Sequence, residues 1–254
     1  MGERLGAQLF ARTTRRVRLT DIGRAHLADT RHVLAQVQAA DAAAAGAALN
    51  PVGLLRITCS NEFGRIYAMP ILTAFLDTYP DVTADVVMVD RVVNMVEERF
   101  DIAVRIGPLP SSGPSAVRVG QVRRIVCGAP TYFAQHGIPR SPSDLAEHRI
   151  ISALPVNPLA DWRFGRDLQG SLRVKPRLTV RSIGGASGLG ACARAVLSGR
   201  PSLRAGDLQS VMEAHEPEPL PIHLVHVEGR RAPVKVRAFI DFAKHRLRAT
   251  AVLN

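Results

Sequence analysis

The sequence predicts an α/β protein of two lobes, preceded by a short basic ribbon and one long helix. From Gly53 onward, short apolar runs alternate with helical segments, which is typical of βαβ units and a parallel sheet. The stretch VRVGQVRRIVCGAP, residues 117–130, reads as extended chain that leaves the first lobe. Before both, residues 21–49 have helical spacing and contain no proline.

Composition limits the possible classes of protein. With 254 residues and 46% hydrophobic content, the chain can bury one or two cores, and its net charge of +11 favours polyanionic partners. Cys59, Cys127 and Cys192 are far apart and lack metal-ligand spacing, so neither a disulfide framework nor a zinc site is expected. No apolar run has membrane-spanning length, and the charged N-terminus does not fit a signal peptide. We therefore expect a cytoplasmic protein without a membrane partner.

The first element is a basic ribbon within LGAQLFARTTRRVRLTDIGRAHL, residues 5–27. Val17 and Leu19 alternate with Arg16 and Arg18, so one face should be apolar and the other basic. Such a turn suits contact with nucleic-acid phosphates without reading the base sequence, the alternative being a solvated basic turn. The candidate phosphate contacts are Arg12, Arg15, Arg16 and Arg18.

The ribbon leads into the long helix. Thr20 has the N-cap position and Asp21 the first turn, where both residue types stabilise a helix start. Asn50, which precedes Pro51, should end the helix. We interpret the helix as a dimerising linker, in preference to a surface helix packed on its own domain.

The remaining elements follow in order. In the first lobe we expect strands at 54–60, 82–89 and 101–107 and helices at 64–78 and 92–100. In the second lobe we expect a helix at 130–136 and strands at 150–154, 162–164 and 172–180. A strand at 220–229 and a helix at 233–247 complete the chain. Trp162 and Phe164 fit a packed core better than a ligand crevice.

Two features could carry ligand chemistry. Ser60, Asn61, Glu62 and Phe63 lie where the first strand gives way to a helix, and free N–H groups there suit an anion. The GxGxxA match that begins at Gly188 indicates a nucleotide-dependent oxidoreductase only if a strand ending in an acid follows. Ser198, Gly199 and Pro201 break the chain before such an acid, and the eight histidines lack metal-ligand spacing. We expect no catalysis, metal or cofactor.

Several motifs carry a resemblance to a known family. LGxxLFxRTTRxxxLTxxG resembles the end of the winged helix-turn-helix of LysR-type transcriptional regulators, from the recognition helix through the wing into the linker helix. GLLRITCSNEFGR, MPILTAFLDTYPDV, FDIAVRIGPL, CGAPTYFAQHGIPRSPSDLAEHR and KVRAFIDFAKHRL are similar, in the same order, to the effector-binding half of that family.

The resemblance implies a periplasmic-binding-protein-like effector domain, double-stranded operator DNA as partner, a small-molecule effector between the lobes, and a homodimer or homotetramer. Its expected domains are the wing at 1–20, the linker helix at 21–50 and the effector domain at 51–254. Lobe one would comprise about 51–117 plus 222–254, and lobe two about 118–221. The implied effector-binding residues are Ser60, Asn61, Glu62, Phe63, Arg105, Ile106, Gly107 and Arg181, although Arg105 is equally compatible with an ion pair to Glu98 or Asp101.

The chain departs from the family pattern at two places. Met1 falls where the recognition helix should be ending, so most of the DNA-reading domain is expected to be missing. ARAVLSGRPSLRAGDL, residues 193–208, has Pro201 and charges where an apolar strand should be, so lobe two is expected to lack a central strand. The alternative function is therefore a stand-alone small-molecule binding protein without specific DNA binding.

Overall fold

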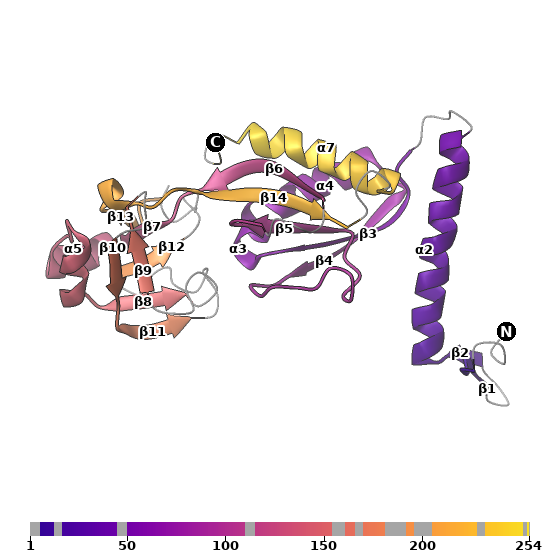
Figure 1. Ribbon diagram of the computed structural model, residues 1–254, viewed down its shortest axis with the longest axis horizontal. Helices are drawn as coiled ribbons and strands as arrows, with labels where there is room; N and C mark the ends of the chain where they lie inside the picture. The colour runs from indigo at the N-terminus through magenta and orange to yellow at the C-terminus, as the bar shows by residue number, and fades with distance from the viewer. Residues whose placement is uncertain are drawn as a thin grey trace.

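The computed structural model contains two α/β lobes side by side, with a long helix and a small ribbon beyond the first lobe (Figure 1). It describes residues 6–12, 17–44, 50–109, 115–153, 161–165, 170–180, 192–195, 205–227, 232–250 and 253. Within these ranges, no helix is long and apolar enough to cross a membrane.

The predicted ribbon and long helix are both present. Strands β1 (Phe10–Arg12) and β2 (Val17–Leu19) pair antiparallel, and α2 (Asp21–Ala44) follows directly. Thr20 joins the two: its hydroxyl accepts a hydrogen bond from the N–H of Gly23 at 2.9 Å and donates one to the carbonyl of Gln8 at 2.6 Å. Its own N–H donates to the carbonyl of Leu9 at 3.0 Å. The predicted N-cap is therefore confirmed, and it ties the helix to the ribbon.

Lobe one is organised around a five-stranded sheet in the order β4-β3-β5-β14-β6. Its strands are β3 (Gly53–Cys59), β4 (Val82–Met88), β5 (Ile102–Ile106), β6 (Ser115–Val122) and β14 (Leu220–His226). The first three run parallel as predicted, and β14 runs against both of its neighbours.

Helices cover one face of this sheet (Figure 1). They are α3 (Asn61–Phe63), a π-helical turn (Gly64–Ala68), α4 (Met69–Thr78) and α7 (Val234–Arg248). Phe75 on α4 packs edge-on against Phe239 of α7, with ring centroids 5.2 Å apart. Near the start of α7, Lys235 forms a largely buried ion pair with Asp101 at 3.2 Å. These contacts join the C-terminal helix to the first half of the lobe.

Residues 92–100 form turns in place of the predicted helix. The apolar spacing of this segment fits a helix, but the side chain of Asn94 accepts hydrogen bonds from the N–H groups of Val96 and Glu97. Arg99 then adopts a left-handed conformation with φ of 59°. These Asn94 contacts cap a single turn, as at a helix start, and the left-handed Arg99 ends that turn before a helix can extend.

Lobe two repeats the architecture of lobe one. Its sheet has the order β11-β8-β12-β7-β13, again with only the fourth strand reversed among the strands described. The strands are β7 (Ile125–Gly128), β8 (Ile150–Ala153), β11 (Pro176–Val180), β12 (Cys192–Ala195) and β13 (Gln209–Val211). α5 (Pro130–His136), two 3₁₀ turns (Pro142–Glu147 and Glu213–His215) and a hairpin of β9 (Asp161–Phe164) and β10 (Gly170–Arg173) complete the lobe.

Two strand predictions in lobe two are wrong. The expected missing central strand is present as β12, between β7 and β8. The residues of β12 are small or cationic, so the sequence shows no apolar pattern there. Pairing with the neighbouring strands places β12 in the sheet centre. The single strand predicted at 172–180 is in fact two strands, β10 and β11. The chain leaves the hairpin sheet at Val174 and Lys175 and joins the five-stranded sheet at Pro176.

The chain passes between the lobes twice, from β6 to β7 and from β13 to β14 (Figure 1). β6 stays in the lobe-one sheet as far as Val122, and β14 enters that sheet at Leu220. The first crossing therefore lies at residues 123–124, later than the expected boundary after residue 117. Arg123 forms paired hydrogen bonds to Glu216, both at 2.8 Å, and so fastens the two crossing segments together.

Candidate functional site

The carboxyl end of β3 is where the sequence predicted an anion-binding helix start. There the N–H of Asn61 donates to Asp90 at 3.0 Å, and its side-chain amide donates to the same carboxylate at 2.9 Å. Asp90 follows β4 in the chain and supplies the negative charge that a helix start favours. The prediction that these N–H groups are free for a ligand is therefore wrong for Asn61.

The neighbours of Asn61 have different environments. Ser60 is half-buried and its side chain does not cap the helix. Glu62 is 7% exposed and pairs with Arg65 at 3.1 Å. Phe63 is fully buried in the lobe-one core, where its ring lies 5.2 Å from that of Tyr67. Of these four predicted effector contacts, the Phe63 side chain serves packing.

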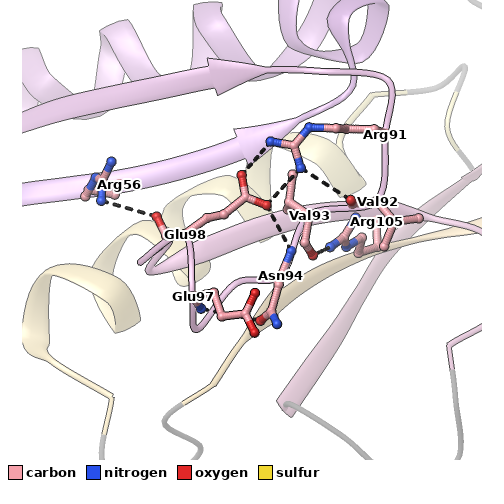
Figure 2. A network of polar contacts seen from close by, with 8 residues as sticks. All are labelled: Arg56, Arg91, Val92, Val93, Asn94, Glu97, Glu98 and Arg105. Carbon is pink, nitrogen blue, oxygen red and sulfur yellow. Dashed lines mark hydrogen bonds and ion pairs between the residues drawn. The ribbon is translucent and has the colours of Figure 1, made fainter.

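Arg105 lies near the end of β5 and holds the turn at 92–100 against the sheet (Figure 2). Its guanidinium donates to the carbonyl of Val93 at 2.7 Å. Glu98 instead accepts two hydrogen bonds from Arg91, of 2.8 and 2.6 Å, and Asp101 forms its ion pair with Lys235. Arg105 therefore forms neither of the two ion pairs considered for it, and burial lowers its pKa.

Two other predicted effector residues lie at the carboxyl end of β5. Ile106 packs against the lobe-one core, and Gly107 has φ of +117°, with its N–H donating to the carbonyl of Pro221 at 2.9 Å. A side chain would be strained at that φ, so this glycine sets the direction of the chain as it leaves β5. Arg181 lies outside the described residues, and so do residues 188–191 of the GxGxxA segment at 188–193.

Sequence reasoning missed two basic side chains beside Arg105. On the neighbouring strands, His223 of β14 is in register with Arg105 of β5 and with Arg118 of β6. The three residues are separated by up to 118 positions in the chain, so no local motif contains them. Only the strand order brings them together.

In the ribbon, Arg18 is exposed and lies opposite Ala11, while Arg12 lies in β1 opposite Val17. Arg15 and Arg16 lie outside the described residues. On the linker helix, Ile22, Val33 and Val37 are each more than half exposed. The N-terminal part thus combines a basic hairpin with a helix that exposes these three apolar side chains.

Comparison with known families identifies the two lobes. The family model described as LysR substrate binding domain matches residues 49–248, which include both lobes. The chain belongs to the LysR family. The repeated strand order of the two lobes is accordingly that of a LysR effector-binding domain of the periplasmic-binding-protein-like type.

LysR relatives match almost the whole chain. An uncharacterized HTH-type transcriptional regulator, YhjC of Escherichia coli K12, is 31% identical over 246 residues, covering 94% of this chain and 82% of the relative. The regulator CrgA of Neisseria meningitidis is 28% identical over 94% of this chain and 82% of its own length. Homology to regulators supports a role in transcription and not in catalysis.

Solved LysR-type structures share the fold. The structure of CrgA from Neisseria meningitidis has a TM-score of 0.67 at 23% identity, covering 97% of this chain and 86% of that one. The full-length Vibrio cholerae virulence activator AphB has a TM-score of 0.66 at 22% identity, covering 95% and 85%. At 95–97% of this chain, these matches extend well beyond the residues of the two lobes.

Three further residues that the sequence singled out have structural roles or environments. Trp162 and Phe164 are 1% and 4% exposed in the lobe-two core, which confirms the packing interpretation. Burial, with Asp90 nearby, raises the pKa of the Cys59 thiol to about 12, so it stays protonated and unreactive. Within the described ranges, no group of three or more His, Cys, Asp or Glu residues could hold a metal ion.

Proposed function

We propose that this LysR-family regulator holds operator DNA through its ribbon and binds its effector beside the carboxyl ends of β3 and β5. Arg12, Arg15, Arg16 and Arg18 would neutralise phosphates of double-stranded DNA. Ser60, Asn61, Glu62, Arg105, Ile106, Gly107 and Arg181 would surround the effector, with Phe63 supporting them from the core. Because its target is the chromosome, the regulator would act in the cytoplasm.

The junction at Thr20 is the observation that carries the DNA-binding half of this proposal. Hydrogen bonds from Thr20 to Gln8 and Leu9 fix the ribbon at the start of α2, so the exposed Arg18 is presented on a rigid support. A basic side chain on a fixed turn loses less conformational entropy on meeting a phosphate than one on a mobile tail.

The linker helix supports a homodimer. Ile22, Val33 and Val37 repeat at spacings that put them on one side of α2, and their exposure leaves apolar area to be covered by a second copy. Pairing of helices would set two ribbons side by side, and further contacts between lobes would give a homotetramer. Effector binding would alter operator affinity by favouring one arrangement of this assembly.

DNA binding is tested by fluorescence anisotropy with a labelled duplex from the upstream intergenic region and a scrambled duplex, across a salt series. We expect binding to have a steep salt dependence, and tighter binding to the native duplex would show that the ribbon and α2 suffice for some sequence-dependent recognition. Arg18→Gln should weaken binding and reduce the slope of log affinity against log salt by about 0.9 if one phosphate contact is lost. Arg237→Gln, an exposed charge on α7, is the matched control and should leave the slope unchanged.

Equal affinity for both duplexes would contradict sequence-dependent recognition. The chain would then be a stand-alone small-molecule binding protein, as the alternative interpretation of the sequence holds. An Arg18→Gln variant with the same salt slope as the unaltered protein would remove the ribbon from the interface.

A further inference from the structure

We propose that Arg105, His223 and Arg118 form a cationic row that binds an oxyanion group, carboxylate or phosphate, of the effector. This inference rests on the proposed effector-binding function and adds the chemical class of the ligand. It also assigns two residues, His223 and Arg118, that neither the motifs nor the family resemblance indicated.

Strand register places the three side chains on one face of the lobe-one sheet. His223 pairs with Arg105 on one side and with Arg118 on the other. Their chain neighbours Val104, Ile222, Leu224, Val117 and Val119 all pack into the core under α4 and α7. Since successive side chains of a strand point to opposite faces, the cationic row lies on the face away from those helices.

The row lies at the same edge as the proposed effector contacts. Thr58 of β3 pairs with Ala103 of β5, and two residues further along each chain come Ser60 and Arg105. Ser60 therefore extends the row by one polar position at the carboxyl ends of the parallel strands. In open α/β sheets this edge is where ligands bind.

The row has an excess of positive charge. Among the described residues, Arg105 and Arg118 have no carboxylate partner: Arg105 donates to the Val93 carbonyl and Arg118 to the side chain of Gln121 at 3.1 Å. Glu98 acts electrostatically on Arg105 but is hydrogen-bonded to Arg91, and Asp90 accepts its hydrogen bonds from Asn61. An oxyanion would therefore meet one half-buried donor, Arg105, and one exposed donor, Arg118, neither of which is hydrogen-bonded to a carboxylate in the described residues.

Protonation of His223 would strengthen such a site. Burial is the main cause that lowers the pKa of His223, and the positive charge of Arg118 adds to it, while a hydrogen bond with the backbone of Gly107 acts in the opposite direction. The charged groups facing His223 from the neighbouring strands are thus Arg105 and Arg118. A bound anion would offset both cations and raise the pKa of His223, so affinity should increase as the pH falls toward 6.

The test is an NMR titration of the full chain with sodium malonate and with inorganic phosphate, at constant ionic strength set by sodium chloride. The imidazole C–H signal of His223 is assigned by its absence in His223→Gln. We expect a saturable shift of this signal and a higher pKa for His223 in the presence of either anion. Neutral malonamide should produce neither effect.

Variants separate the site from general screening of a chain with charge +11. Arg105→Gln should weaken anion affinity about tenfold or more, because it removes a half-buried charged donor. Arg118→Gln, an exposed change with little risk to folding, should weaken it about two- to threefold. Arg237→Gln removes one charge on the helix-covered side and should have no effect.

Two results would overturn the inference. One is a shift that grows linearly with anion concentration, or that chloride reproduces. The other is equal weakening in Arg118→Gln and Arg237→Gln, which would indicate screening of net charge alone. Both results leave DNA recognition untouched, because the anisotropy experiment uses no effector, so failure here is distinguishable from failure of the proposed function.

Discussion

At the scale of single residues, Gly23 is a position where the junction between ribbon and helix has no room for a side chain. It lies in the first turn of α2 against the ribbon, and a Cβ added there would come 1.9 Å from the carbonyl oxygen of Leu9. That oxygen is held in place because it accepts the hydrogen bond from the N–H of Thr20. The obstacle is backbone and cannot rotate away.

We therefore expect Gly23→Ala to weaken operator binding. Alanine would gain about 1 kcal/mol in helix propensity, but overpacking typically costs about 1–3 kcal/mol, so the net effect is a displaced ribbon. The main thermal transition of the lobes should change little. Anisotropy and thermal unfolding measure the two effects, with Ala25→Ser, an exposed change on the same turn, as control. Unchanged operator affinity in Gly23→Ala would contradict the assigned role of the junction.

Single residues also show which contacts sequence reasoning could reach. Thr20 was predictable because a cap acts within three residues of its partner, here Gly23. Asp90 was not, because the helix start that it satisfies lies 29 residues away in the chain. His223 and Arg118 escaped notice for the same reason, since their meeting depends on the order of strands and not on local spacing.

At the scale of elements, strands with a strong apolar pattern were predicted well and segments of mixed character were not. β3, β5 and β14 each bury branched aliphatic side chains at several positions, and this composition indicates a buried strand. The segment at 92–100 has apolar residues at helical spacing, yet it forms a single turn that begins at Asn94 and ends where Arg99 adopts a positive φ. β12 has no apolar pattern, so its central position could not be read from the sequence.

A polar contact between α5 and the end of the following 3₁₀ turn predicts that lobe two loses stability in acid. The N–H of Arg149 donates to the hydroxyl of Tyr132 at 2.9 Å, and this hydroxyl lies 3.1 Å from Nδ1 of His148. The hydroxyl can donate a hydrogen bond to Nδ1 only if Nδ1 carries no proton. Burial is the main cause that lowers the pKa of His148, with His136 adding to it and Asp144 and Glu147 opposing it.

The sign of the pH effect follows from linkage. The unfolded chain protonates His148 near its ordinary pKa of 6.5, before the folded chain does, so stability is complete above that pH. It is lost as the pH falls from 6.5 through the lower folded pKa. We expect Tm to drop between pH 7.5 and 5.5 by less in His148→Gln than in the unaltered protein. The exposed His245→Gln is the control, and parallel Tm curves for all three proteins would contradict this assignment.

At the scale of the whole molecule, a route of direct contacts connects the proposed effector site with the linker helix. Arg105 holds Val93 at one end of the turn, and near the other end Arg99 forms an ion pair with Asp29 of α2 at 2.7 Å. The carbonyl of Arg99 also accepts a hydrogen bond from Arg56 at 3.3 Å, which fixes that end to β3. An effector that draws Arg105 away from Val93 would therefore act on the same turn that contacts the linker.

The Arg99–Asp29 pair should couple α2 to lobe one by a small but measurable amount. Both side chains are 51% exposed, so a double-mutant cycle of Arg99→Ala and Asp29→Ala in thermal unfolding should give about 0.2–1 kcal/mol. Most of this coupling should vanish at 1 M salt, where the Debye length is about 3 Å. Asp29→Ala combined with Arg237→Ala should be additive, because Arg237 forms no ion pair with Asp29 in the described part of the structure. Additivity in the first cycle at low salt would show that this ion pair does not couple α2 to lobe one, and effector binding would then have to reach the ribbon by another route.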